Sequence, residues 1–586
     1  MFIAKLSPLA FLIGSVTTYA AVPPDAGSLG NNIRQETQSV LPSLAEPSLL
    51  LPSTDNSSVS SVSEESSTRI TLKKISFSGD YNRTTDVGIS SNDLNKLVLP
   101  WLGKSISFED MQKMVNQITH YFHSRGLIAT QALLPPQTVK DGNLNVYILS
   151  GKYDIPDILN KTDVRSELIR RIAQATTPEG DIVKNDELQR LALLLGEIPG
   201  TKSQVSLAPG SKKGTTALGI NLSPTERVGG YFGVDNQGDP TTGRSRVMLG
   251  GYVNNIVGTG DLLSVNLMDS WEHSNLFTGD IDYSSSINGY GSRIGLNYSH
   301  LNYRFNFMGE KFSGDSNNWM LYVTHPLVRK ADTRIDVRLD GGQQYLTDKY
   351  PATLFGGALD DEGYKRVSQG RLTVSGASSA LMAGGVSGFS ISGSQGQTIY
   401  RNDTARLLGF ADEAGTAGRF VRMNYQFSHE QQLTDTFSFF TRLNGQLANH
   451  NLDTSQKLLL GGPSAVRAYD VGDGSVDNGN MFTAELRKRW DSPIPAFSSI
   501  SPDLTVAAFY DQGWGQQYKN NKNQVYGGHL TDKNNLNLSG AGIYAVLEKA
   551  GNYSLSLTWA HRTGNSDPVS GHSDDDRFWF TAVKNF

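Results

Sequence analysis

The chain has 586 residues, no cysteine and a formal net charge of −5, so cysteine chemistry is excluded and no basic field points to nucleic acid. Its mean hydropathy of −0.34 excludes a bundle of membrane helices, but it does not exclude a membrane barrel, whose strands face lipid with only every second residue. The 60 glycines, 23 tyrosines and 24 phenylalanines suit a large β structure with many turns and aromatic girdles.

Residues 1–20 resemble a secretory signal peptide. Lys5 supplies a positive charge, the apolar run 9–16 follows, and Ala20 is a small residue at the expected cleavage position. The alternative is a buried N-terminal helix. The apolar run is too short for a membrane-spanning helix, and its length is typical of the apolar part of a signal peptide. No later segment has about 18 consecutive apolar residues, so the sequence predicts export without a spanning helix.

Residues 21–69 are polar and rich in Pro and Ser. The stretch from Asp25 to Val40 predicts one helix with a polar surface. The Ser-rich run 57–67, which follows several prolines, cannot bury enough apolar surface to order itself, and we interpret it as a linker.

Residues 70–151 predict a small α+β domain. Ser107 and Asp110 have the spacing of a helix capping box, and the apolar residues after them recur at helical spacing as far as Gly126. A strand region starts over residues 70–77, and two short strands are predicted over 128–133 and 144–149.

Residues 152–225 repeat this organisation more faintly. Helices are predicted over 164–173 and 186–195, and strands over 204–207 and 216–221. The two blocks are therefore candidates for one domain type used twice.

From residue 226 to 586, short alternating segments recur between Gly, Asn, Asp and Ser. Ile335, Val337 and Leu339, for example, alternate with charged residues. A soluble sandwich would turn its apolar face inward, whereas a membrane barrel turns it toward lipid and keeps charges in a wet lumen. The export signal favours the barrel. The predicted fold is mainly β: about 360 residues at roughly 22 per strand give a transmembrane antiparallel β-barrel of about 16 strands.

The C-terminal end predicts an insertion signal. Phe578, Phe580 and Phe586 share one face of the last predicted strand, with Lys584 also on that face. Outer-membrane barrels commonly end in such an aromatic residue, which the barrel-assembly machinery recognises.

Several segments resemble the two-partner secretion transporter family of haemolysin, filamentous-haemagglutinin and haemopexin-type transporters, within the POTRA and β-barrel superfamily. The resemblance covers nearly the whole mature chain and implies two periplasmic POTRA domains ahead of the barrel. The matching segments are 125–129, 134–137, 234–238, 242–244, 254–261, 460–469 and 509–513. Segments 281–285 and 286–290 favour the haem–haemopexin branch.

The most specific part of the resemblance is a pair of motifs. Residues 460–469 resemble a loop that folds into the lumen, and residues 509–513 resemble the barrel wall that receives it. The resemblance implies a latch between Arg467 and Asp511, since a guanidinium can make two parallel hydrogen bonds to a carboxylate. The alternative is an ordinary lumen charge. The accompanying motif residues are Val466, Tyr469, Phe509 and Gly513, and Ala468 stands where the family usually has Gly.

The resemblance implies an outer-membrane protein of a Gram-negative bacterium that exports one large β-helical partner protein without ATP. POTRA domains would capture the partner by β-augmentation, and the helix at 25–40 would be a removable plug. A haemopexin-binding, haemolysin, adhesin or contact-inhibition cargo stays open. The alternatives are a barrel insertase, which would carry about five POTRA domains, and a ligand-gated nutrient or haem uptake transporter, which would carry a large plug domain.

Catalytic and metal motifs are absent from the sequence. No G-x-S-x-G, H-E-x-x-H or Walker loop occurs, and we interpret His120 and His123, three apart on the predicted helix, as solvated or packed side chains. Ser, Asp and His are plentiful in the barrel region, so an outer-membrane hydrolase is an alternative on composition alone, but no motif supports it. The sequence therefore predicts no enzyme, no cofactor and no metal site.

Overall fold

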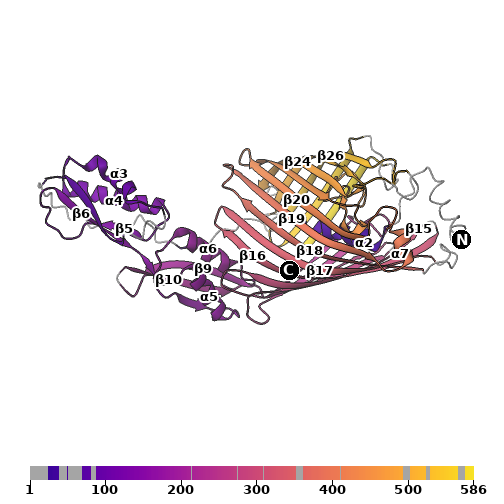
Figure 1. Ribbon diagram of the computed structural model, residues 1–586, viewed down its shortest axis with the longest axis horizontal. Helices are drawn as coiled ribbons and strands as arrows, with labels where there is room; N and C mark the ends of the chain where they lie inside the picture. Colours follow the sequence, from indigo (N-terminus) through magenta and orange to yellow (C-terminus); the bar gives the residue numbers. More distant parts are fainter. Residues whose placement is uncertain are drawn as a thin grey trace.

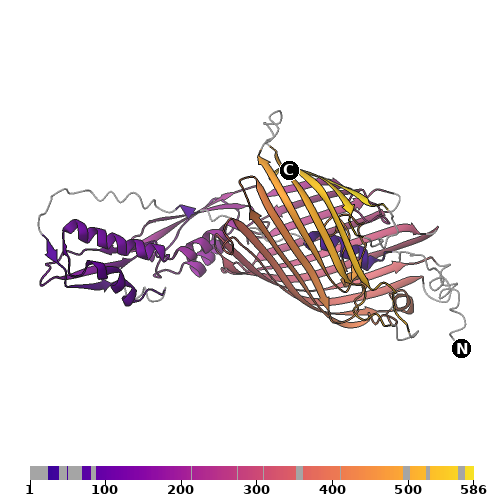
Figure 2. The ribbon, with the colours of Figure 1, turned by 90° about the horizontal axis from the view of Figure 1, so that it is seen from above.

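The computed structural model describes residues 24–38, 49–50, 69–80, 88–212, 214–272, 275–307, 309–351, 361–409, 411–491, 502–522, 528–564 and 574–586. The predicted signal peptide and most of the predicted linker lie outside these residues. Two small α+β units lead in a row to one end of a large barrel, and helix α2 (Ala26–Gln38) lies inside the barrel (Figures 1 and 2).

The first unit packs two helices on a three-stranded sheet. Its elements are β2 (Ile70–Thr71), β3 (Lys74–Gly79), α3 (Ser91–Val98), the 3₁₀ turn η4 (Leu99–Trp101), β4 (Ser105–Ile106), α4 (Phe108–Ser124), β5 (Thr130–Leu133) and β6 (Asn143–Ser150). The sheet order is β3-β6-β5, with β3 parallel and β5 antiparallel to β6. The predicted capping box begins α4, because the Ser107 and Asp110 side chains each accept a backbone N–H of the other residue.

The strand region expected from residue 70 consists of two strands, β2 and β3, and only β3 joins the main sheet. Helix α3 was missed, although Ser90 and Asp93 also form a capping box at its start. Only Leu94 and Val98 are buried on this short helix, so its apolar repeat is too brief to be recognised from periodicity.

The second unit covers one face of a sheet with two helices. Its elements are β7 (Lys152–Tyr153), β8 (Asp157–Asn160), α5 (Ser166–Thr176), α6 (Asn185–Gly196), β9 (Thr201–Pro209) and β10 (Thr215–Pro224). β9 and β10 form a hairpin, and β7 and β8 run parallel to β10. On the other edge, the short strand β1 (Leu49–Leu50) pairs in parallel with β9. The edge of this sheet therefore accepts an extended segment of chain.

The turn at residues 254–261 docks the second unit on the barrel. The Gly258 carbonyl oxygen accepts the Arg165 backbone N–H at 2.9 Å, and Asn255 has a left-handed backbone with φ of 53°. The Asp261 carboxylate accepts backbone N–H groups of this turn, including that of Ile256 at 2.8 Å. A second contact joins Arg329 to Glu197 at 2.6 Å. The family-like segment 254–261 thus positions the second unit.

The barrel is closed by 16 antiparallel strands, as predicted. They are β11 (Val228–Asp235), β12 (Arg246–Asn254), β13 (Leu262–Ser270), β14 (Asn275–Ser286), β15 (Arg293–Phe307), β16 (Glu310–Arg329), β17 (Thr333–Lys349), β18 (Glu362–Ser378), β19 (Gly385–Tyr400), β20 (Gly418–Gln432), β21 (Phe437–Ala448), β24 (Asn478–Asp491), β25 (Asp503–Gln516), β26 (Asn535–Lys549), β27 (Tyr553–Arg562) and β28 (Asp576–Asn585). The last strand, β28, pairs with the first, β11, so the sheet has no open edge.

The barrel wall turns apolar side chains outward. On β17, Leu339 is 60% exposed, whereas the next residue, Asp340, is 5% exposed and pairs inside the lumen with Arg371 of β18 at 2.8 Å. This confirms the predicted membrane barrel, because a soluble sandwich would show the opposite arrangement. In the described part of the chain, no helix is both long and apolar enough to cross a membrane.

Candidate functional site in the barrel lumen

A long connection between β21 and β24, residues 449–477, folds back into the barrel. It contains the 3₁₀ turn η6 (Thr454–Gln456) and a small ribbon of β22 (Leu458–Leu459) with β23 (Ser475–Val476). We call this connection the lumen loop. Its tip packs tightly, since Leu460, Val466 and Tyr469 are fully buried against the barrel wall. The predicted motif residues therefore lie together inside the barrel.

Arg467 and Asp511 are in direct contact, in the geometry the resemblance implies. Arg467 Nε lies 2.7 Å from Asp511 Oδ2, and Nη2 lies 2.9 Å from Oδ1. The Arg467 backbone N–H also donates to Oδ2 at 3.2 Å. Asp511 points inward from β25 and is 1% exposed. The two parallel hydrogen bonds fix both the position and the plane of the guanidinium.

Three further wall residues hold the same loop tip. Glu485 of β24 lies 2.9 Å from Arg467 Nη2, and the Phe509 ring centroid lies 3.4 Å from the guanidinium carbon. The Trp579 indole of β28 donates to the Arg467 carbonyl oxygen at 2.7 Å. Phe509 was predicted, but Glu485 and Trp579 were missed, because they come from strands that no motif singles out.

Small residues in the wall make room for the motif. A Cβ added at Gly513 would lie 2.9 Å from a Val466 methyl group, so glycine at this position lets Val466 approach β25. A Cβ added at Gly540 would lie 2.4 Å from the Ala468 Cβ. Among the described residues, the only non-glycine residues with positive φ are Asp141 and Asn255. Ala468 therefore occupies an ordinary backbone conformation, and Gly540 leaves space for its methyl group.

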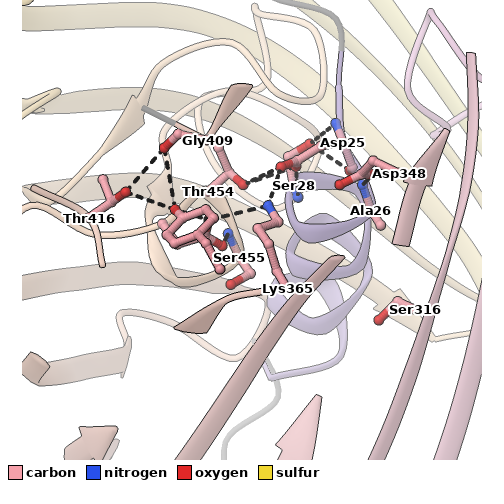
Figure 3. Close-up of polar contacts among 12 residues, drawn as sticks. Asp25, Ala26, Ser28, Ser316, Asp348, Lys365, Gly409, Thr416, Thr454 and Ser455 are labelled. Atoms are coloured by element: carbon pink, nitrogen blue, oxygen red, sulfur yellow. Dashed lines mark hydrogen bonds and ion pairs between the residues drawn. The ribbon is translucent and has the colours of Figure 1, made fainter. Parts of the chain in front are cut away.

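The predicted N-terminal helix crosses the lumen as α2 and is anchored at its start (Figure 3). The Asp25 carboxylate lies 2.7 Å from Lys365 Nζ of β18, and Lys365 also meets Asp453 of the lumen loop at 3.2 Å. The Ala26 backbone N–H donates to Asp348 of β17 at 2.8 Å. One lysine thus connects the helix, the wall and the loop.

The rest of the helix contacts both the lumen loop and the opposite wall. The Gln35 amide donates to the Leu459 carbonyl oxygen at 2.8 Å and accepts the Leu459 N–H at 3.1 Å. Near the other end of the helix, Glu36 lies 3.1 Å from Arg246, which in turn pairs with Asp235 at 2.8 Å. The polar surface predicted for this helix is therefore satisfied by wall and loop groups.

One stripe of the helix is apolar and was not predicted. Ala26 and Leu29 are buried in a cluster of wall residues that includes Leu301, Tyr303 and Phe305. The stripe is short, and it repeats too briefly for periodicity to distinguish it from chance. The helix is thus held by apolar packing as well as by charges.

The three C-terminal aromatic residues lie on the outside of the barrel. Phe578, Phe580 and Phe586 are 69%, 38% and 68% exposed. The Phe586 backbone exchanges two hydrogen bonds with Gly230, at 2.8 and 2.9 Å, which extends the pairing between β28 and β11. These side chains face the lipid and lie away from the Arg467–Asp511 contact in the lumen.

The two histidines of the first unit lie far from this site in the fold. A ring nitrogen of His123 contacts the Thr130 carbonyl oxygen of β5 at 3.1 Å. Burial lowers the pKa of His123, so the neutral ring is favoured. His123 is therefore a packed side chain, one of the two environments expected for it.

Comparisons with known proteins place the whole chain in one family. Residues 214–531, more than half of the chain, match the family model described as haemolysin secretion/activation protein ShlB/FhaC/HecB. Residues 70–151 match a POTRA domain of the ShlB type. Among the relatives, the heme/hemopexin transporter protein HuxB of Haemophilus influenzae is 29% identical over 100% of this chain and 98% of its own length.

Two further proteins are similar to this chain over most of its length. The outer membrane transporter CdiB of Dickeya dadantii is 23% identical over 72% of this chain and 73% of its own length. The solved structure of CdiB from Escherichia coli has a TM-score of 0.70 and 18% identity, and the match covers 97% of this chain and 100% of that one. The chain belongs to the ShlB/FhaC/HecB family of haemolysin secretion/activation proteins, and it is a two-partner secretion transporter of the Gram-negative outer membrane that exports a partner exoprotein.

Proposed function

We propose that the exported partner is one large β-helical exoprotein used in haem acquisition. The support is the name of the Haemophilus influenzae relative, whose match spans the whole chain. Members of the family are transporters and not enzymes, so no catalytic step is assigned. Since ATP is not expected outside the inner membrane, folding of the partner at the cell surface would drive export.

The identity of the partner can be tested with a deletion strain. Mass spectrometry of the culture supernatant should show loss of a single very large β-helical protein that binds haem–haemopexin. Loss of a haemolysin, an adhesin or a contact-inhibition toxin instead would overturn the haem assignment while leaving the export function intact.

The proposed division of the chain assigns a role to each part. Residues 1–20 would be the signal peptide, 21–69 the plug helix and linker, 70–151 and 152–225 the two POTRA domains, and 226–586 the barrel. The separate apolar clusters of the two α+β units support the boundary between the two POTRA domains. One cluster gathers residues mainly from 72–148 and the other from 153–222. The POTRA domains would lie in the periplasm.

The first POTRA domain is the proposed capture site, by addition of a cargo strand to a sheet edge. β3 and β5 are the two edges of its sheet. On β5, the Ala132 N–H is bonded to the Thr119 hydroxyl of α4 at 2.9 Å, and His123 meets the Thr130 carbonyl oxygen. Groups of β5 are thus already satisfied by α4, which favours β3 as the receiving edge.

Cysteine cross-linking can separate the two edges, because the chain has no native cysteine. Ser76→Cys on β3 should trap an exported partner that carries a cysteine, and Gln131→Cys on β5 should trap much less. The reverse result would move the capture site to β5. Normal export after deletion of residues 70–151 would refute capture by this domain altogether.

The lumen latch is the proposed control point for export, and the observation that carries it is the two-pronged contact between Arg467 and Asp511. The contact fixes the tip of the lumen loop, whose residues fill part of the lumen. Loss of Arg467 leaves the buried Asp511 carboxylate without its cation, and loss of Asp511 leaves Arg467 with Glu485 alone, although water in the lumen limits the cost of either change. The barrel should therefore persist while the loop loses its position.

The test compares secretion by single and double variants. Arg467→Ala and Asp511→Ala should each reduce cargo in the supernatant about tenfold or more per barrel, and the double variant should be little worse than either, because one interaction is lost once. Arg467→Lys should also be impaired, since an ammonium cannot reproduce the paired contact.

A matched control is the ion pair between Arg371 and Asp340. This pair also lies in the lumen, but it joins two wall strands and includes no residue of the lumen loop. Arg371→Ala should leave export near normal. Fully additive defects at Arg467 and Asp511, or an equally strong defect at Arg371, would show that the latch has no specific role.

The terminal aromatic residues are proposed as the signal read by the barrel-assembly machinery. Their exposure on the outer face of β28 supports this role. Deleting Phe586 should lower the amount of heat-modifiable barrel in outer-membrane fractions. Unchanged abundance would count against the signal.

A further inference from the structure

Asp470 is a buried carboxylate in the lumen loop that no motif accounts for. It follows Tyr469 and has no exposed surface. Arg577 meets it with Nε 3.0 Å from Oδ1 and Nη2 3.1 Å from Oδ2. Arg244 meets it from another side, with Nη1 2.8 Å from Oδ1 and Nη2 3.1 Å from Oδ2. One carboxylate thus takes two guanidinium groups, each through two nitrogens.

The two arginines come from opposite sides of the barrel closure. Arg577 is the second residue of β28, the last strand, and Arg244 precedes β12 in the loop after β11, the first strand. The Arg244 backbone N–H is itself fixed by Glu272 at 2.9 Å. Asp470 therefore ties the lumen loop to both flanks of the seam where the barrel closes on itself.

The ladder between β11 and β28 stops short at the N-terminal end of β28, where Asp470 contacts Arg577. The regular pairing of β11 with β28 ends at Asp235↔Thr581, whereas β27 and β28 remain paired as far as His561↔Asp576. Beyond Asp235, the Asn236 side chain continues the contact by donating to the Phe578 carbonyl oxygen at 2.8 Å. Beyond the regular ladder the backbone contributes one longer hydrogen bond, from the Asn236 N–H to the Phe580 carbonyl oxygen at 3.3 Å, and the Asn236 side chain supplies further contacts across this end of the seam.

We propose that Asp470 is a positioning residue that closes this end of the seam and couples it to the lumen loop. When the loop is displaced, the carboxylate leaves and two guanidinium groups face each other across the closure. Their repulsion then favours separation of the β28 end from the β11–β12 loop. The contact of Asp470 with Arg244 and Arg577 is distinct from the Arg467–Asp511 contact, which holds the loop against β25.

Hydrogen–deuterium exchange of the full chain in lipid nanodiscs tests this coupling directly. In Asp470→Asn, backbone exchange at residues 576–581 and 236–245 should be about tenfold faster or more, because local opening of the seam costs less. The matched control is Asp477→Asn, which neutralises another fully buried carboxylate of the same loop, one paired with Lys457 at 3.0 Å instead of with the seam. It should leave exchange at both seam segments unchanged.

A compensating variant separates positioning from general damage. Asp470→Asn combined with Arg577→Gln replaces the ionic contact by an amide pair and removes the repulsion, so it should restore much of the protection. If Asp470→Asn does not fold, Arg244→Gln keeps the contact with Arg577 and should show a smaller rise at 236–245. Unchanged exchange in Asp470→Asn, an equal rise in Asp477→Asn, or no recovery in the double variant would overturn the proposal.

Discussion

The first POTRA-like unit and the barrel use the same alternating strand pattern with opposite orientation. On β6, Leu144, Val146 and Ile148 are buried under the helices. On β17, Leu339 faces outward and Asp340 faces inward. A period of two therefore specifies a two-faced strand, but the solvent on each side decides which face is interior.

This difference has a consequence for movement. The interior of the first unit is apolar and close-packed, so nothing can leave it without opening a cavity. The barrel interior combines small apolar clusters with many ion pairs and hydrogen bonds, such as Asp25 with Lys365, and water can replace these polar contacts. A helix and a loop can therefore occupy the lumen in one state and leave it in another without unfolding the wall.

The largest effect should come from a charge placed in the apolar interior. Val146 is fully buried, so Val146→Asp buries a carboxylate without a partner and should cost about 4 kcal/mol or more. The first unit should unfold and export should stop, while the barrel still inserts. Limited proteolysis and supernatant cargo measure the two effects, with Val146→Ile as the control. Retained export would mean that the folded unit is not needed.

Helix α2, the proposed plug, gives the sharpest contrast in the polar interior. Deleting residues 25–42 should raise single-channel conductance in planar bilayers, because α2 fills the lumen through contacts that water can replace. Lys365→Met should raise it in part, since Asp25 and Asp453 lose their shared cation. Lys349→Met, which removes an ion pair with Glu362 at the end of β17, serves as the control. Equal conductance before and after the deletion would refute the hypothesis that α2 is a plug.

Long repetitive patterns and specific motifs made much of the molecule predictable from its sequence. The strand number of the barrel and the helix α4 follow from periodicity and capping, and the Arg467–Asp511 contact follows from the family resemblance. Helix α3, Glu485, Trp579 and the role of Lys365 could not be predicted. Glu485, Trp579 and Lys365 act between strands that become neighbours only when the sheet closes, and a single sequence does not contain that information, whereas the apolar repeat of α3 is too short to be recognised.

A charge on the lipid face should have an intermediate effect. Leu339→Arg places a guanidinium against hydrocarbon and should destabilise the barrel by about 2–4 kcal/mol if the residue lies near the bilayer midplane. Asp340→Asn, one residue away on the lumen face, should cost much less because water and Arg371 remain nearby. Urea unfolding in lipid vesicles measures both variants. Equal costs for the two would contradict the assignment of the faces.

The smallest effect concerns a carboxylate outside the membrane, in the second unit. Asp154 Oδ2 accepts the Ser211 hydroxyl at 2.6 Å and the Ser211 backbone N–H at 2.7 Å, which fastens the turn between β9 and β10. These hydrogen bonds to the ionised form hold the pKa of Asp154 well below its ordinary value. Because the folded pKa is depressed, the contribution to stability is complete above the unfolded pKa of about 3.9 and is lost as pH falls toward the folded pKa.

Pepsin, which is active in this acidic range, can report on the β9–β10 turn in the full chain. Cleavage near Ser211 should accelerate progressively as pH falls below about 4, because the opened turn then binds a proton that the closed turn excludes, and opening costs less free energy. Asp154→Asn should show the faster cleavage already at higher pH and little further change on acidification. Asp157→Asn, on the neighbouring strand β8, should keep the wild-type pH dependence. If the Asp154→Asn variant retains the same acid-induced acceleration, a titratable group other than Asp154 controls the opening of the turn. The packing of β9 against β10 then holds the turn without Asp154.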